Sequence, residues 1–455
     1  MATNRMIDRF APPGKAKAAA TPTSAPTGTV KTSPEFDEIK RSMHNELLDT
    51  LDFEEVANTA KEELYERMRQ SLTDRMESRN PAITRPERER MVQEILDNIL
   101  GLGPIEVLVR DPAVSDILIN GPKNVFVDRK GKLIKTNVVF EDDKHLMQII
   151  ERIVVAVGRR VDEQTPMVDA RMIDGSRFNA IIKPLSIDGA AVSIRRFGKV
   201  PILAEDLIAF GSCPRPMMET LRGAVHSGLN TIISGGTGSG KTTLLNVLSG
   251  FIPPTERIIT IEDSAELQLQ QEHVVRLETR PANIEGKGEV TQRELVKNCL
   301  RMRPDRIILG EIRGAEAIDM LTAMNTGHDG SLATVHANNT ADALARFETM
   351  VGIGMPNMTP RAIRETIARA LDVIVQQTRL TDGSRRVIAI TEVTGMEGEI
   401  ITTQDIFVFQ QESVDKNGKV RGRYKATGVR PRFASTLASH GIHLAPQLFE
   451  FEMEV

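Results

Sequence analysis

The strongest indication of the fold of this 455-residue chain is the stretch Thr231–Leu248, TIISGGTGSGKTTLLNVL. A short apolar run is followed by a glycine-rich loop and then by an apolar helical pattern. Within the loop, Gly235, Gly240, Lys241 and Thr242 fit the pattern GxxxxGK[ST] of a phosphate-binding loop (P-loop). Glycines let backbone N–H groups turn inward around phosphates, and the following helix adds the positive end of its dipole. We therefore predict an ATP site, with Lys241 at the β- and γ-phosphates and the Thr242 hydroxyl on Mg²⁺.

The region around this loop predicts an α/β domain over residues 217–455. Strand-sized apolar runs alternate there with helical patterns, which is typical of a largely parallel sheet covered on both faces. The residues that we assign to ATP binding are Gly235, Gly236, Thr237, Gly238, Ser239, Gly240, Lys241, Thr242 and Thr243.

Two glutamates follow runs that we expect to be core strands of this domain. Glu262 comes directly after Arg257–Ile261, and Glu311 follows Arg306–Leu309 after one glycine. Ligands of open α/β sheets bind beyond the carboxyl ends of the strands, so both glutamates are catalytic candidates. We favour Glu262 for polarising the attacking water and Glu311 for the Mg²⁺ side, although spacing leaves this choice open. Each could instead cap the next helix, and the same two readings stand for Asp263 and Glu266.

Two histidines flank another strand-sized run, Leu332–Val335. His328 precedes the run and His336 follows it. Either side chain could read the γ-phosphate by hydrogen bonding, or could be a structural histidine. Neither has a neighbouring set of zinc ligands in the sequence. We therefore count both as catalytic candidates and expect no zinc site.

The chain before residue 217 predicts four further regions. Residues 1–34 are rich in Ala, Pro and Thr and should form a disordered leader. Residues 35–101 repeat apolar side chains three or four positions apart, which predicts a helical bundle. Residues 102–205 carry short β-like runs between turn signals and should form an α+β domain. Residues 206–216 contain Pro214 and Pro216 and are expected to be a linker.

Composition argues against several classes of function. The chain has no Trp and 2 Tyr, so it lacks the aromatic platforms on which single-stranded nucleic acids stack. A net charge of -4 provides no general attraction for phosphate backbones. Two cysteines, Cys213 and Cys299, are too few for a disulfide framework or a cysteine-rich zinc site. No run is long and apolar enough to span a membrane, so we expect a soluble cytoplasmic protein.

The motifs together resemble those of the secretion and pilus ATPases, the motors of type II secretion, type IV pili and type IV secretion. GGTGSGKTT matches the Walker A motif of that family, ITIED its Asp box, LRMRPDRIILGEIR its Walker B motif and GHDGSLATVHANN its His box. The resemblance extends over about residues 102–400. The segments SDILING, DARMIDGSRFNAII and VSIRRF are most similar to CpaF-like ATPases of Flp/Tad pilus assembly.

This resemblance implies a homohexamer in which ATP binds between a RecA-like C-terminal domain and the preceding α+β (PAS-like) domain. In the family, arginines of that preceding domain reach the phosphates. The arginines here that match those segments are Arg177, Arg195 and Arg196, with Arg171 as a further candidate; each could instead be a solvated strand residue. Some members carry a tetra-cysteine zinc module, which two cysteines cannot form.

The resemblance further implies a motor at the cytoplasmic face of the inner membrane that acts on a platform protein to insert or extract pilin subunits. No sequence-specific nucleic acid is expected as a partner. The alternatives are a type IV secretion motor that exports protein or DNA, a nucleotide-gated switch without useful turnover and, least favoured, a nucleic-acid translocase.

Overall fold

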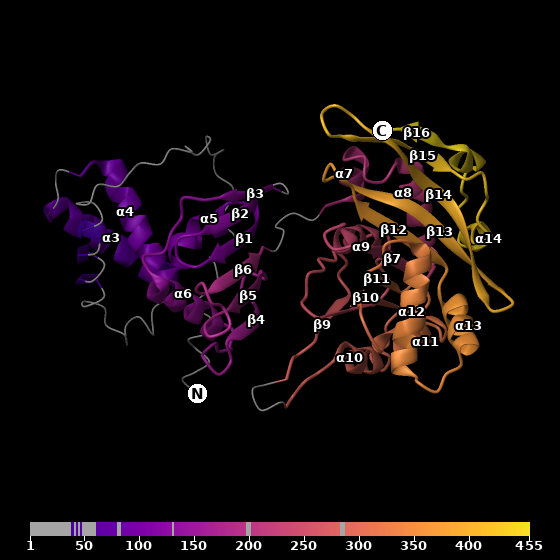
Figure 1. Cartoon of the computed structure of the whole chain (residues 1–455), viewed down its shortest axis with the longest axis horizontal. Coiled ribbons are helices and arrows are strands. Elements are labelled where there is room, and N and C mark those ends of the chain that lie inside the picture. Colours follow the sequence, from indigo (N-terminus) through magenta and orange to yellow (C-terminus); the bar gives the residue numbers. More distant parts are fainter. Residues whose placement is uncertain are drawn as a thin grey trace. The chain divides into compact units, whose positions relative to one another are not determined.

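The computed structural model describes residues 38–40, 42–43, 46–47, 61–79, 83–129, 132–196, 202–282 and 287–455. The predicted leader, residues 1–34, lies outside the described residues, as does much of the first part of the predicted helical bundle. The described residues form two compact units, one before and one after residues 197–201 in the sequence (Figure 1).

The first unit contains two long helices, α3 (Lys61–Arg79) and α4 (Arg85–Leu100). Their apolar residues recur at helical spacing and pack against each other in one small core, which includes Leu72, Met76 and Met91. This agrees with the helical pattern of the sequence. Two short helices, η3 (Gly103–Ile105) and α5 (Glu106–Arg110), lead into the sheet of this unit.

That sheet has six antiparallel strands in the order β3–β2–β1–β6–β5–β4. One face packs on helix α6 (Asp143–Ala156), as the alternating burial of β5 and β6 requires. The expected α+β arrangement is therefore present. The strands are β1 (Val114–Asn120), β2 (Val125–Arg129), β3 (Lys132–Lys135), β4 (Met167–Arg171), β5 (Arg177–Ile181) and β6 (Ala191–Arg195).

The second unit is built on a ten-stranded sheet in the order β16–β15–β14–β13–β12–β7–β11–β10–β8–β9. Its parallel part is fully sandwiched between helices, so β7, β8 and β11 are buried along their whole length. The parallel strands are β7 (Thr231–Gly235), β8 (Ile258–Glu262), β9 (Val274–Glu278), β10 (Arg306–Ile312), β11 (Leu332–Val335) and β12 (Val373–Arg379). This confirms the predicted α/β class with a RecA-like P-loop core.

Helices cover both faces of this sheet. One core forms between the sheet and α8 (Arg215–His226) and α9 (Lys241–Ser249). The opposite core contains α10 (Gln292–Cys299), α11 (Glu316–Met324), α12 (Thr340–Gly354) and α13 (Pro360–Ala370) (Figure 1). The sheet continues into antiparallel strands that the sequence pattern did not separate from the parallel part: β13 (Arg385–Glu397), β14 (Ile400–Val414), β15 (Val420–Ala426) and β16 (Glu452–Glu454). The remaining short helices are α14 (Ala434–Ser439) and η4 (Pro446–Glu450).

Residues 206–216, expected to be a linker, lie instead inside the second unit. They include the end of α7 (Ala204–Ala209) and the start of α8, and the side chains of Leu207 and Cys213 are buried in its core. The Tyr424 hydroxyl donates to the carbonyls of Gly211 and Ser212, each at 3.1 Å. The prolines here start a helix rather than mark a flexible connection.

Candidate nucleotide site

The P-loop connects the end of β7 to the start of α9, as the sequence predicts. Gly238 and Gly240 adopt φ of 71° and 98°, a left-handed conformation that side-chain-bearing residues rarely take. A Cβ on Gly235 would lie 2.3 Å from the carbonyl oxygen of Gln377 on β12, so no larger residue fits there. The Lys241 ammonium donates to the Gly236 carbonyl at 3.3 Å. All nine predicted ATP-binding residues therefore share one loop and the first turn of α9.

Buried polar atoms around this loop lack partners within the described residues. They are Ser234 Oγ at the end of β7, Ser239 Oγ in the loop and Gln377 Oε1 beneath it. Buried polar groups in folded proteins are nearly always hydrogen-bonded, so such atoms suit a site that receives a polar ligand or ordered water. The loop thus offers the hydrogen-bonding capacity that phosphates require.

A charged cluster gathers beside Lys241 at the carboxyl ends of three strands. Burial lowers the pKa of Lys241, and the negative charge of Glu311 on β10 opposes that shift. His336 directly follows β11, the strand between β7 and β10. Partial burial and then the Lys241 charge lower the pKa of His336, which favours its neutral form. The structure therefore brings together Lys241, Glu311 and His336 as the sequence predicted.

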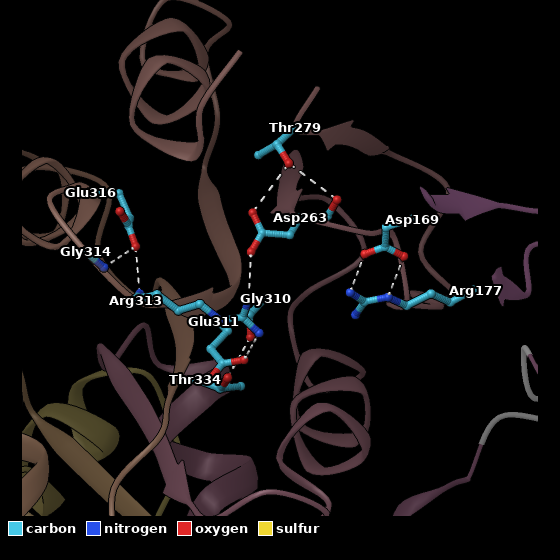
Figure 2. Close-up of polar contacts among 10 residues, drawn as sticks. All are labelled: Asp169, Arg177, Asp263, Thr279, Gly310, Glu311, Arg313, Gly314, Glu316 and Thr334. Atoms are coloured by element: carbon cyan, nitrogen blue, oxygen red, sulfur yellow. Dashed lines mark hydrogen bonds and ion pairs between the residues drawn. The ribbon is translucent and has the colours of Figure 1, made fainter. Parts of the chain in front are cut away.

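Arg313 belongs to this cluster but was not a candidate in the sequence. Its guanidinium donates to Glu311 Oε2 at 2.8 Å and lies 3.3 Å from Asp263 Oδ2 (Figure 2). Thr279 contacts the other oxygen of Asp263 at 3.4 Å. The signal was available: Arg313 stands two residues after Glu311, so both side chains lie on the same side of an extended chain. Glu316 anchors the backbone N–H groups of Arg313 and the next residue, at 2.7 and 2.8 Å.

Glu262 has features of both roles that the sequence left open, a cap for the following segment and a catalytic carboxylate. Its Oε2 accepts from the backbone N–H groups of Glu266 at 2.7 Å and Leu267 at 3.0 Å, so it does cap the following turn. Its Oε1 is buried without a partner among the described residues. Burial raises the pKa of Glu262 to about 7, against the lowering effect of those two hydrogen bonds. Such a carboxylate is well suited to accept a proton near neutral pH.

The two glutamates differ in their distance from the P-loop strand. Strands lie about 4.8 Å apart, so β10 is about 10 Å from β7 and β8 is about 14 Å away. The side chain of Glu262 nevertheless extends from β8 toward β7, because Gly310 on β10 leaves room for it. The Cγ of Glu262 lies only 2.9 Å from the position that a Cβ on Gly310 would take. The side chain of Glu262 therefore lies over β10, one strand closer to Lys241. This explains why a glycine precedes Glu311.

The structure does not bring His328 to the P-loop. His328 precedes β11, and its carbonyl accepts from the Ser331 hydroxyl at 2.8 Å at the amino end of that strand. The P-loop lies at the carboxyl end of the parallel neighbour β7. The two histidines are thus separated by the length of a strand, about 13 Å at 3.3 Å per residue. Within this unit the position of His328 favours the structural reading of that histidine, and His336 stays the candidate for the γ-phosphate.

The arginines proposed from the resemblance lie on the sheet of the first unit. Arg171, Arg177 and Arg195 are direct neighbours across β4, β5 and β6 and so share one face. Arg177 makes a two-pronged contact with Asp169, at 2.7 and 3.3 Å (Figure 2). Arg196 differs, because its guanidinium donates to the backbone carbonyls of Asp111, in the loop before β1, and Val114, the first residue of β1. That contact gives Arg196 a structural role.

Neither cysteine takes part in this chemistry. Cys213 and Cys299 are buried, and burial raises the pKa of each thiol to about 12. Within the described ranges, no group of three or more His, Cys, Asp or Glu side chains is placed to hold a metal ion. The part of the chain that the structure describes contains no helix with the length and apolar character needed to cross a membrane.

The chain is similar to several known proteins. A Mycobacterium tuberculosis protein that is named as a conjugal transfer protein is 36% identical to this chain over 308 residues. These residues are 66% of this chain and 87% of that protein. The conjugal transfer protein TrbB of Rhizobium radiobacter is 30% identical, over 71% of this chain and 97% of its own. The crystal structure of the Brucella suis VirB11 ATPase shares 28% identity and a TM-score of 0.35, covering 63% of this chain and 91% of that one.

The match to a protein family covers most of the chain. Residues 98–429, from the end of α4 to beyond β15, match the family described as type II/IV secretion system protein. That stretch contains the P-loop, both glutamates and the arginines of the first unit. The chain therefore belongs to the type II/IV secretion system protein family.

Proposed function

We propose that this ATPase powers the assembly of a Flp/Tad-type pilus, as a homohexamer at the cytoplasmic face of the inner membrane that acts on a platform protein. Family membership supports a secretion or pilus motor. The finer assignment rests on the similarity of SDILING, DARMIDGSRFNAII and VSIRRF to CpaF-like proteins. In this proposal the second unit, residues 202–455, forms the ATPase domain, and residues 102–196 of the first unit supply further contacts to the nucleotide.

The observation that carries the proposal is the charged cluster at the P-loop. Lys241 and the loop amides bind the phosphates, and a neutral His336 can donate a hydrogen bond to an oxygen of the γ-phosphate. The hydroxyl of Thr242 and the carboxylate of Glu311 are the groups that would hold Mg²⁺, which neutralises charge on the phosphates when bound. The unpartnered oxygen of Glu262, oriented by its two backbone hydrogen bonds, is the proposed acceptor for a proton of the attacking water.

Arg177 and Arg195 are the proposed phosphate ligands from the first unit. The Arg195 side chain is 64% exposed, and its ion pair among the described residues is a long contact of 3.3 Å to Asp116. Arg195→Ala should therefore preserve folding and lower turnover by about 10³-fold or more, the effect of losing an arginine finger. Arg196→Ala should instead destabilise the loop before β1. Equal turnover in the wild type and Arg195→Ala would remove this arginine from the mechanism.

A type IV secretion motor is the second candidate, favoured by the conjugal-transfer names of the relatives. Deletion of the gene in the source organism separates the two candidates, with complementation by the wild type and by Lys241→Ala. Loss of surface pili with normal plasmid transfer supports the pilus motor. Loss of plasmid transfer with normal pili supports the secretion motor. Restoration of the lost function by Lys241→Ala would contradict an ATP-driven role in either system.

A further inference from the structure

Two arginines of the second unit face each other directly. Arg379 ends β12 and Arg385 begins β13, and the two residues are register partners in the antiparallel pair. Both residues are exposed, and neither has an ion-pair partner among the described residues. Like charges directly opposite each other on a sheet are destabilising. In the absence of ligand the two guanidinium groups therefore repel each other, and a bound anion would reduce this repulsion.

Several other arginines of this unit are paired with carboxylates. Arg421 on β15 pairs with Asp415 at 3.1 Å, and Arg423 pairs with Glu452 at 2.7 Å. On α13, Arg361 pairs with Glu365 at 3.1 Å. Arg379 and Arg385, without an ion-pair partner among the described residues, lie at the edge of the sheet where the P-loop lies, since β12 runs parallel to β7 as its direct neighbour.

Both arginines reach the same glycine of the P-loop. Arg385 Nε donates to the Gly238 carbonyl at 3.0 Å, and its Cδ lies 3.2 Å from the position that a Cβ on Gly240 would take. Arg379 Nη1 lies 3.9 Å from the corresponding position on Gly238. A Cβ on Gly240 would crowd Arg385, whereas the distance at Gly238 is that of an ordinary van der Waals contact. The loop between Arg379 and Arg385 thus places two guanidinium groups against the outer part of the P-loop.

We propose that Arg379 and Arg385 together bind a phosphate group of the nucleotide held by the P-loop of the same chain. The planar donors of arginine suit phosphate oxygens and form charge-assisted hydrogen bonds. This inference rests on the proposed function, because it needs nucleotide at the P-loop. It assigns to each subunit an arginine pair of its own, separate from the arginines of the first unit and from Lys241.

The test is a titration of the full-length protein with ADP and with a non-hydrolysable ATP analogue. The variants are Arg379→Gln, Arg385→Gln and the double variant, with Arg421→Gln as the matched control. Each single variant should bind about 10-fold more weakly, because it loses charge-assisted hydrogen bonds to a phosphate oxygen. Affinity should also become less sensitive to salt in the double variant. Arg421→Gln should bind like the wild type.

Arg379→Gln is the decisive variant, because the Arg379 side chain makes no hydrogen bond to the loop within the described residues. Without nucleotide its melting temperature should equal or exceed that of the wild type, since one of two repelling charges is gone. The stabilisation added by nucleotide should shrink. Wild-type affinity in the double variant would overturn the inference, including the case in which the pair binds a carboxylate of a neighbouring subunit. A wild type that binds no nucleotide would instead overturn the proposed function.

Discussion

Arg313, the residue directly after β10, donates a hydrogen bond of 2.8 Å to the carboxylate of Glu311 on that strand (Figure 2). The same guanidinium lies 3.3 Å from Asp263, which follows β8. Arg313 therefore connects the ends of two core strands and restrains the carboxylate nearest to Lys241. We infer that it positions Glu311 for its role beside the phosphates.

Replacing Arg313 by glutamine should release Glu311 without unfolding the protein, since the arginine side chain is 58% exposed. We expect turnover to fall by about 10- to 100-fold, in the range of losing a positioning contact. Phosphate release and thermal melting should be measured together. Arg361→Gln, which removes an exposed arginine from a pair with Glu365, is the control. Unchanged turnover in Arg313→Gln would show that Glu311 needs no such restraint.

Glu262→Gln should abolish turnover while leaving or improving stability at alkaline pH. Burial raises the pKa of Glu262 from 4.5 to about 7, so the folded chain holds this proton more tightly than the unfolded chain. Its contribution to stability therefore falls as pH rises between about 4.5 and 7. For the wild type, the resulting decrease in the free energy of unfolding is on the order of 1–3 kcal/mol. The glutamine variant does not show this decrease, because its side chain cannot ionise.

Two measurements check this variant. Wild-type turnover should rise with pH through about 7, as the carboxylate becomes able to accept a proton. The difference in melting temperature between Glu262→Gln and the wild type should move in favour of the variant over the same pH interval. Substantial turnover in Glu262→Gln and in Glu311→Gln, each tested alone, would contradict the assignment of both residues.

Gly310→Ala should impair catalysis through Glu262. The added methyl group would lie 2.9 Å from the Cγ of Glu262, closer than real contacts allow, so the glutamate must shift. We expect a folded protein whose turnover is at least about 10-fold lower and whose nucleotide affinity is nearly unchanged. Gly352→Ala is a suitable control, because a Cβ on Gly352 would contact nothing within 4 Å. Wild-type turnover in Gly310→Ala would show that the position of Glu262 does not matter.

The two histidines should behave differently when replaced by glutamine. His336 lies beside Lys241, so His336→Gln should slow phosphate release at unchanged melting temperature. His328 lies at the amino end of β11, with a buried Nδ1 that has no partner within the described residues. His328→Gln should affect the melting temperature more than the catalytic step. A larger loss of single-turnover rate in His328→Gln than in His336→Gln would reverse this assignment.

Local signals predicted the P-loop because every part of it is written in consecutive residues. The strand Thr231–Gly235, the glycines and the helix from Lys241 need no information from elsewhere in the chain. Glu262 and Glu311 were found the same way, from apolar runs that end in a carboxylate. Whether a segment forms a strand, a loop or a helix was thus predictable wherever consecutive residues carry the pattern.

Contacts between distant segments were not predictable in this way. Arg385 reaches Gly238 across 147 residues of sequence, and only the pairing of β12 with both β7 and β13 brings them together. The strand order likewise decides that His336 lies near Lys241 while His328 lies at the other edge. The expected linker was wrong because its prolines start α8, whereas burial of Leu207 and Cys213 depends on the distant β13–β15 region.

Phosphate release by the purified full-length chain measures directly whether the P-loop cluster hydrolyses ATP. Wild type should hydrolyse ATP in the presence of Mg²⁺, and so should Lys297→Ala, which removes an exposed lysine from α10. Lys241→Ala should lose at least about 100-fold, since the P-loop lysine stabilises charge on the phosphates. Wild-type turnover in Lys241→Ala would show that the P-loop is not the site of hydrolysis.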